Sequence, residues 1–274
     1  MNTIMTRVKA GATTPFRLLH ISDTHLTLAD ERDDKRKNDL AAGRHPAFAN
    51  AEKYLAEACE IAKKEHMPIV HTGDLIDFVS EANLDAAKKF MDENDVFFTV
   101  GNHEFSLYVG EAFEDEAYRN QSLAHVQESF PDPLRFCVRK INGVKLIGID
   151  DGYYRFDKEQ FDALKKEAAE GLPIILFLHN PLHEPELYEE SMKKNPCAYL
   201  TSTPEELMKG YDEYRYRQQK ADEITLEVTR YIESCPLIKA IFAGHLHWDY
   251  EGIVAGRVPQ YVTGIGTARI ITVE

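Results

Sequence analysis

The feature of this chain that most constrains its fold is a repeated pairing of a short apolar segment with a polar cluster. Five segments that are predicted to be buried strands are each followed at once by Asp, Asn or His side chains. The five pairs read FRLLHI-SDTHL, PIVH-TGDLID, VFFTV-GNHEF, PIILFL-HNPLH and IKAIFA-GHLHW. Ligands of open α/β sheets bind at the carboxyl ends of the strands. The repetition therefore predicts an α/β fold in which the five clusters converge on one site.

Longer amphipathic segments alternate with these strands. Apolar residues recur at helical spacing in residues 46–66, and residues 81–92 and 157–170 are also predicted to be helical. The segment RFCVRKINGVKLIGID predicts two strands around an Asn-Gly turn, and the glycine-broken, β-branched tail predicts antiparallel strands. This order favours a mixed α/β core, with parallel early strands and hairpin-like later ones. No Pro/Gly/Ser-rich linker divides the chain, so we expect a single domain over residues 1–274.

Charge and composition exclude several classes of protein. The formal net charge is −14, from 32 basic and 46 acidic residues, which argues against general nucleic-acid binding. A phosphorylated substrate stays compatible, because a bound metal ion reverses the local field. The four cysteines form no C-x-x-C pair, so we expect buried thiols rather than a zinc knot. No apolar segment has the length of a signal peptide or a membrane span, and we expect a soluble cytoplasmic protein.

The side chains that should converge form a specific donor set. They are carboxylates, imidazoles and one amide, with no thiolate, which suits divalent Mn, Fe, Zn or Co. The expected ligands are Asp23, His25, Asp74, Asn102, His179, His245 and His247. Seven ligands are too many for one ion, but they suffice for two ions if one carboxylate bridges them.

The order of the clusters resembles a known family. DTH, GDLID, GNHE, LHNP and GHLH follow one another as in the calcineurin-like metallophosphoesterases, and the resemblance covers nearly the whole chain. It implies a two-sheet mixed β-sandwich flanked by helices. It also implies that Asp74 bridges the two ions and that His103 faces the substrate without binding metal. The remaining ligands divide into Asp23, His25 and His247 for the first ion and Asn102, His179 and His245 for the second.

The resemblance implies a metal-dependent hydrolase of small phosphate monoesters or diesters. A metal-activated water would attack phosphorus, while His103 stabilises the developing charge or protonates the leaving oxygen. Phe78 and Val79 stand where related protein phosphatases have Arg and Gly, and Asp77 stands where purple acid phosphatases have a metal-binding Tyr. Protein phosphatase activity and the charge-transfer metal site of the purple acid phosphatases are therefore not expected. A pyrophosphohydrolase of nucleotide-linked substrates, a nuclease and a non-catalytic interaction module with or without metal are the alternatives.

Several residues near the motifs have two interpretations each. Asp77 and Glu104 are expected to orient histidines. His183 could touch substrate or be structural, and Asp151 or Tyr153 could line the pocket or form a turn. The charged residues 30–39 are expected to form a solvated loop that could border the substrate entrance. Residues 211–223 are predicted to be a helix, exposed on its Arg face, in which Arg215 could bind phosphate or contribute to a dimer contact.

Overall fold

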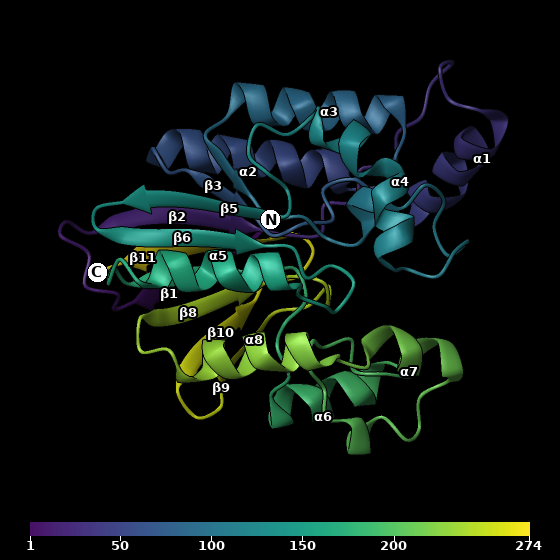
Figure 1. Ribbon diagram of the computed structural model, residues 1–274. Coiled ribbons are helices and arrows are strands. Elements are labelled where there is room, and N and C mark those ends of the chain that lie inside the picture. The colour runs from purple at the N-terminus through teal and green to yellow at the C-terminus, as the bar shows by residue number, and fades with distance from the viewer.

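Two β-sheets pack face to face in the computed structural model, which describes residues 1–274, and helices cover the outer face of each sheet (Figure 1). The first sheet has the strand order β1-β11-β2-β3-β4. Its strands are β1 (Asn2–Val8), β11 (Thr267–Val273), β2 (Phe16–Ile21), β3 (Ile69–His71) and β4 (Val96–Phe98). Strands β2, β3 and β4 run parallel, whereas β11 runs antiparallel to β2 and parallel to β1.

The second sheet has the order β5-β6-β7-β8-β10-β9. Its strands are β5 (Phe136–Ile141), β6 (Val144–Ile149), β7 (Ile174–Phe177), β8 (Ile238–Ala243), β10 (Val258–Val262) and β9 (Tyr250–Val254). The central four are parallel, and the edge strands β5 and β9 are antiparallel to their neighbours. Asn142 and Gly143 connect β5 to β6 with φ angles of 46° and 80°, as a two-residue hairpin of this type requires.

Helices complete the outer layers. On the first sheet lie α2 (Ala51–Glu65), α3 (Glu81–Glu93) and α4 (Glu116–Gln127), and on the second lie α5 (Lys158–Ala168) and α8 (Glu223–Ser234). At the carboxyl end of β6 lie α1 (Lys35–Arg44), α6 (Pro185–Lys194) and α7 (Glu213–Gln219) (Figure 1). Asp side chains cap the N-termini of α1, α4, α5, α7 and α8 by accepting a backbone N–H, which satisfies a donor that the helix itself leaves unpaired.

Successive side chains of each strand point to opposite faces of its sheet, and the apolar ones form three separate layers. Leu18 of β2 points into the layer between the sheets, whereas its neighbour Leu19 points to the layer under α2 and α3. The layer between the sheets includes Leu18, Val70 and Phe97 from the first sheet and Leu146, Phe177 and Phe242 from the second. The two-sheet sandwich that the family resemblance implies is therefore confirmed. None of the helices combines the length and the apolar character that crossing a bilayer requires.

Most predicted elements are confirmed, and the differences have physical causes. The helix predicted over residues 46–66 begins at Ala51, after the 3₁₀ turn η1 (His45–Ala47). The prediction of a loop over residues 30–39 is wrong in part, because α1 starts at Lys35, and Ala41 is its one buried residue. Within the tail, only β9 and β10 pair with each other as antiparallel strands, because β11 joins the first sheet between β1 and β2. The sequence analysis did not predict β1, α4, α6 or α8, and the helix predicted over residues 211–223 is shorter, since α7 ends at Gln219.

A buried arginine joins the two sheets. Arg269 of β11 is fully buried, and its guanidinium donates to Thr6 Oγ1 of β1 at 2.7 Å. It also donates to Thr263 Oγ1 at 3.0 Å and to the carbonyl oxygen of Val262 at 3.1 Å, and it pairs with Glu251 of β9 at 2.6 Å. Because a buried guanidinium must be hydrogen-bonded to be tolerated, these partners fix how the edge strands of the two sheets meet.

Replacement of Arg269 should therefore destabilise the protein. We expect Arg269→Ala to lower the free energy of unfolding by about 3 kcal/mol, because it opens a cavity and leaves buried acceptors without a donor. Arg7→Ala is the control, since the Arg7 side chain is 79% exposed and only pairs with Glu274 at 3.4 Å, so it should leave stability unchanged. Urea unfolding followed by circular dichroism measures both, and equal midpoints for the two variants would contradict the role of Arg269.

Candidate metal centre

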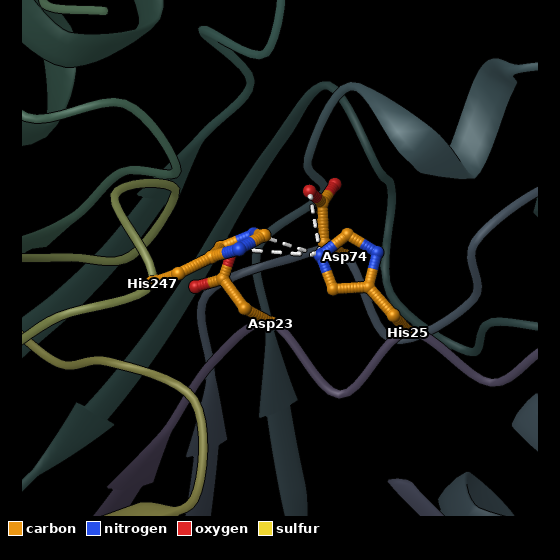
Figure 2. A group of neighbouring side chains, drawn as sticks. All are labelled: Asp23, His25, Asp74 and His247. Atoms are coloured by element: carbon orange, nitrogen blue, oxygen red, sulfur yellow. Dashed lines mark hydrogen bonds and ion pairs between the residues drawn. The ribbon is translucent and has the colours of Figure 1, made fainter. Parts of the chain in front are cut away.

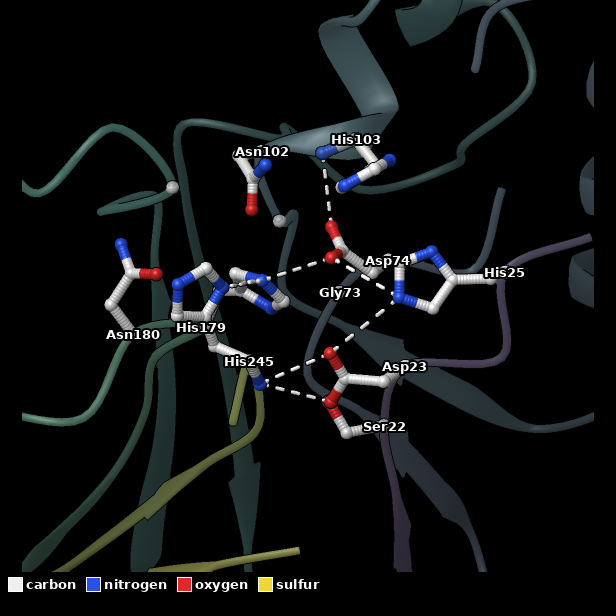
Figure 3. A network of polar contacts seen from close by, with 12 residues as sticks. Ser22, Asp23, His25, Gly73, Asp74, Asn102, His103, His179, Asn180 and His245 are labelled. Carbon is white, nitrogen blue, oxygen red and sulfur yellow. Dashed lines mark hydrogen bonds and ion pairs between the residues drawn. The ribbon is translucent and has the colours of Figure 1, made fainter. Parts of the chain in front are cut away.

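The five predicted clusters converge where β2, β3 and β4 of one sheet and β7 and β8 of the other sheet end (Figure 3). All seven predicted ligands lie in this region. Asp23, His25, Asp74 and Asn102 follow strands of the first sheet, and His179, His245 and His247 follow strands of the second. The centre therefore spans the line along which the two sheets meet.

The first group of ligand atoms comprises Asp23, His25, Asp74 and His247, whose donor atoms all lie within 4.8 Å of one another (Figure 2). His25 Nε2 is 3.1 Å from His247 Nε2 and 3.6 Å from Asp74 Oδ2. Asp23 Oδ1 is 3.5 Å from His247 Nε2. The His247 side chain is 42% exposed while that of Asp23 is buried, so the centre opens to solvent beside His247.

The second group comprises Asp74, His179 and His245. His179 Nε2 is 3.2 Å from Asp74 Oδ2 and 3.0 Å from His245 Nδ1. Asn102 lies beside this group (Figure 3), and its side-chain oxygen is buried with no hydrogen-bond partner. A buried amide oxygen without a partner costs free energy, and binding a cation at this oxygen would remove that cost. Asp74 belongs to both groups, so the arrangement matches the predicted division of ligands.

Hydrogen bonds on the far side of two rings decide which nitrogen faces the centre. His25 Nδ1 is 2.9 Å from Asp77 Oδ1, and His179 Nδ1 is 2.7 Å from the carbonyl oxygen of Thr72. A carbonyl oxygen accepts only, so Nδ1 of His179 carries a proton, and the Asp77 carboxylate favours the same for His25. Nε2 of both rings is thereby directed inward, as metal ligation by histidine requires.

Tyr154 is the outer hydrogen-bond partner of His245, and its hydroxyl can either accept the proton of Nε2 or donate its own. Its hydroxyl is 2.6 Å from His245 Nε2, and the Tyr154 side chain is fully buried. Because Nδ1 of His245 faces His179, its lone pair is free only when Nε2 carries the ring proton and donates to the Tyr154 oxygen. The sequence analysis did not single out Tyr154. The signal was present, however, since IDDGYY forms a sixth polar cluster at a strand end, after β6.

The inward nitrogens face one another in pairs, and either one shared proton or one cation can bridge each pair. Burial opposes protonation of His179, but Asp74 and Asp23 raise its pKa to about 10. Burial and the neighbouring His179 hold the pKa of His245 well below its usual range. The pair thus favours a single proton between two donor nitrogens. A divalent ion can take the place of that proton, and the mixed oxygen and nitrogen donors fit one.

The ligands reach the centre through an unusual backbone conformation. Five of them have left-handed φ angles: Asp23 at 55°, His25 at 52°, Asp74 at 55°, His245 at 69° and His247 at 62°. Such angles cost a non-glycine residue about 1–3 kcal/mol each. Buried hydrogen bonds hold the turns, because Asp23 accepts the backbone N–H of His245, and Glu104 accepts those of Asp74 at 2.9 Å and Gly101 at 2.7 Å.

Close approach of the strand ends explains two motif glycines. A Cβ on Gly101 would overlap the Asp74 carboxylate, and a Cβ on Gly244 would overlap the Ser22 hydroxyl. Any larger residue at either position would push apart the loops that carry the ligands. The glycines of GNHE and GHLH are therefore steric requirements of the centre.

The two residues expected to orient histidines act differently. Asp77 does so, because it contacts His25 Nδ1, while Arg44 holds its carboxylate through two hydrogen bonds of 2.7 and 2.8 Å. The expectation for Glu104 is wrong. Its carboxylate contacts no histidine and instead accepts backbone N–H groups of two ligand loops, including that of Leu75 at 2.7 Å.

His103 lies beside the first group, and its ring forms a third cluster of possible donor atoms with His25 and Asp77. Its ring Nδ1 is 2.7 Å from the carbonyl oxygen of Asp77, and its backbone N–H donates to Asp74 Oδ1 at 2.9 Å. Burial opposes charge on this ring, but Asp74 and Asp77 raise its pKa to about 10. Asn102 has helical angles and precedes the 3₁₀ turn η2 (His103–Phe105), so the chain turns sharply and both side chains face the centre (Figure 3).

The remaining candidates lie outside the two ligand groups. His183 packs against the ring of Tyr188 with a centroid distance of 5.9 Å. Asp151 accepts the backbone N–H groups of His179 at 2.9 Å and Asn180 at 3.1 Å, so it supports a strand end. Tyr153 is part of the apolar layer over the first sheet.

Comparisons with known proteins agree with this geometry. The family model described as calcineurin-like phosphoesterase matches residues 16–249. No curated protein matches the chain by sequence. A dimetal phosphatase from Danio rerio is similar in structure, with a TM-score of 0.50 and 13% identity over 91% of this chain and 87% of that one. At this identity the likeness shows the fold.

Two further solved structures have lower scores. A putative 5′-nucleotidase from Staphylococcus aureus has a TM-score of 0.45 and 13% identity over 92% of this chain and 49% of that one, so this chain spans about half its length. The phosphopantetheinyl hydrolase of Mycobacterium tuberculosis has a TM-score of 0.41 and 14% identity over 90% of this chain and 89% of that one.

Tyr154 and Tyr153 provide a matched pair of variants for the tautomer argument. Tyr154→Phe removes the partner of His245 Nε2, so we expect the affinity for Mn²⁺ to fall about 10- to 100-fold. Tyr153→Phe removes a hydroxyl that is buried without a partner and should leave that affinity unchanged. Calorimetric titration of metal-depleted protein measures both constants, and the same affinity in both variants would mean that Tyr154 does not control the ring.

Proposed function

This chain belongs to the calcineurin-like phosphoesterase family, and we propose that it hydrolyses phosphate esters with two divalent metal ions. Family membership makes it a metal-dependent hydrolase. The observation that carries the proposal is the presence of two ligand groups that share Asp74. A purely structural metal site needs only one closed set of four ligands. A non-catalytic module of the same fold is disfavoured, because no ligand of the family pattern is missing and all seven converge.

The residues that would hold each ion follow from the two groups. Asp74 would bridge, Asp23, His25 and His247 would hold the first ion, and Asn102, His179 and His245 would hold the second. The donor set suits Mn, Fe or Zn. When bound, such a pair of ions activates water for attack on phosphorus and neutralises charge on the phosphoryl group.

His103 is the residue that we assign to the reaction itself. Its Nδ1 is engaged by the Asp77 carbonyl oxygen, which leaves Nε2 to act on the substrate. Without metal, Asp74 and Asp77 raise the pKa of this ring to about 10 against the effect of burial, and Asp77, which is not a proposed ligand, would still favour a proton on the ring when Asp74 holds the ions. That proton can go to the leaving oxygen or stabilise charge on the phosphoryl oxygens.

The substrate we propose is a small phosphorylated molecule. A net charge of −14 opposes binding to a nucleic-acid backbone, which depends on basic residues that replace counterions. The opening beside His247 admits a ligand from solvent. Within this class, phosphate monoesters, diesters and nucleotide-linked pyrophosphates share the chemistry that the centre supports, and an assay panel of the three separates them.

Metal content tests the dinuclear centre. We expect two equivalents of Mn²⁺ per chain by elemental analysis after loading, with hydrolysis of the panel dependent on that metal. Asp74→Ala should lower both metal content and activity more than Asn102→Ala, because Asp74 belongs to both ligand groups. One equivalent at most in the wild type, or equal occupancy in the two variants, would argue against a shared bridging carboxylate.

Leaving-group dependence tests His103. His103→Gln should keep both metals, lose activity steeply on alkyl phosphates and lose less on nitrophenyl phosphates, since nitrophenolate departs without a proton. The ratio of kcat/KM between the two ester series, measured with metal content, is the readout. A uniform loss would assign His103 to stabilising charge on the phosphoryl oxygens, and loss of metal would make it a ligand or an orienting residue.

A further inference from the structure

Helix α7 places a guanidinium beside the second ligand group. Arg215 is half-buried, and its guanidinium carbon lies 5.0 Å from the centre of the Tyr199 ring. The Tyr199 ring in turn contacts the ring of His245, with a centroid distance of 5.8 Å. One aromatic ring therefore separates this cation from a ligand of the metal centre. In Figure 1, α7 lies at the same end of the sandwich as α4 and α6.

The guanidinium has hydrogen-bond donors to spare. Arg215 forms no ion pair with a carboxylate, and its one side-chain hydrogen bond runs from Nη1 to Gln218 Oε1 at 2.7 Å. None of its other nitrogens is buried without a partner, so they reach solvent. In contrast, Arg44 near the same centre is paired with the Asp77 carboxylate through two hydrogen bonds. An unpaired, half-buried guanidinium in a chain with a charge of −14 is suited to bind an anion.

A chain of hydrogen bonds fixes α7 against the centre. Gln218 Nε2 donates to Glu114 Oε2 at 2.5 Å, and Asn102 Nδ2 donates to Glu114 Oε1 at 3.4 Å. The same Asn102 has its side-chain oxygen unpaired. One continuous hydrogen-bond network thus runs from Arg215 through Gln218 and Glu114 to Asn102. The network fixes the position of the guanidinium relative to the second ligand group. Tyr214 adds an aromatic contact, since its ring packs on Phe113 at 5.3 Å.

We propose that Arg215 forms an anion subsite beside the metal centre, and that it selects phosphate esters which carry a second anionic group. The Tyr199 ring keeps the guanidinium away from the ligand nitrogens, so it meets a group beyond the phosphate that is hydrolysed. A planar guanidinium binds either a carboxylate or a phosphate through two parallel hydrogen bonds. The inference rests on the proposed function, because it concerns the substrate of that centre.

The test compares Arg215→Gln with Arg217→Gln on three substrates. Arg217 is on the same helix, is exposed and stacks on Phe113, so it controls for loss of charge. The substrates are propyl phosphate and its two analogues whose far end carries a carboxylate or a second phosphate. We expect Arg215→Gln to raise KM for at least one of the two analogues with a second anionic group by about 10-fold or more, while kcat, metal content and activity on propyl phosphate are retained. The analogue affected identifies the anion.

Other outcomes separate the two proposals. Equal losses on all three substrates, no selective loss, or the same effect from Arg217→Gln would overturn the subsite and leave the hydrolase standing. If the wild type hydrolyses no ester, the proposed function fails, and anion-binding measurements then test the subsite on its own. Calorimetric titration of Mn²⁺-loaded protein with inorganic pyrophosphate and with orthophosphate should then show that Arg215→Gln weakens only pyrophosphate binding. Equal weakening of both anions, or of neither, overturns it.

Discussion

The hydrogen bonds on the outer sides of the buried histidines are the interactions on which the centre depends. An imidazole can present a lone pair from only one nitrogen when neutral, and the partner of the other nitrogen decides which one. Asp77 and the Thr72 carbonyl oxygen make that decision for His25 and His179, and the Tyr154 hydroxyl is the corresponding partner of His245. The partners come from two loops, since Thr72 and Asp77 follow β3 and Tyr154 follows β6. The donor set is therefore fixed by the fold and not only by the motif residues.

The ligand loops show the same dependence on the rest of the fold. Left-handed angles at Asp and His residues are unfavourable in isolation, and here they persist because buried acceptors collect the backbone N–H groups of the turns. Glu104 accepts most of these N–H groups at the strand ends of the first sheet, and Asp151 accepts those that follow β7 in the second sheet. Burial raises the pKa of each of these two carboxyls to about 7, against the opposing effect of those N–H donors.

Much of this could be predicted from the sequence, because residue types and their positions after strands carry the information. The seven ligands, the hairpin at Asn142 and most buried strands follow from local patterns. Tyr154 and the role of Glu104 do not, since each depends on which distant groups the fold brings within hydrogen-bond reach. Strand β1 could not be predicted for a similar reason, because it pairs with the distant strand β11, with Asn2 opposite Thr267. Helix α1 lacks an apolar stripe, as only Ala41 is buried.

The position of the centre across both sheets has a mechanical consequence. Four of the candidate ligands follow strands of the first sheet and three follow strands of the second. The distance between these two sets of donors therefore depends on the distance between the sheets. That spacing depends on the apolar layer between the sheets, in which Phe97 of the first sheet packs against Phe177 of the second with ring centroids 5.7 Å apart, and Phe177 stacks on Phe242 at 5.5 Å. Protein interiors are close-packed and transmit strain. The packing between the two sheets thus controls the distance between donors that different sheets carry. A shift of one sheet relative to the other would change the geometry of the candidate centre without replacing any donor residue.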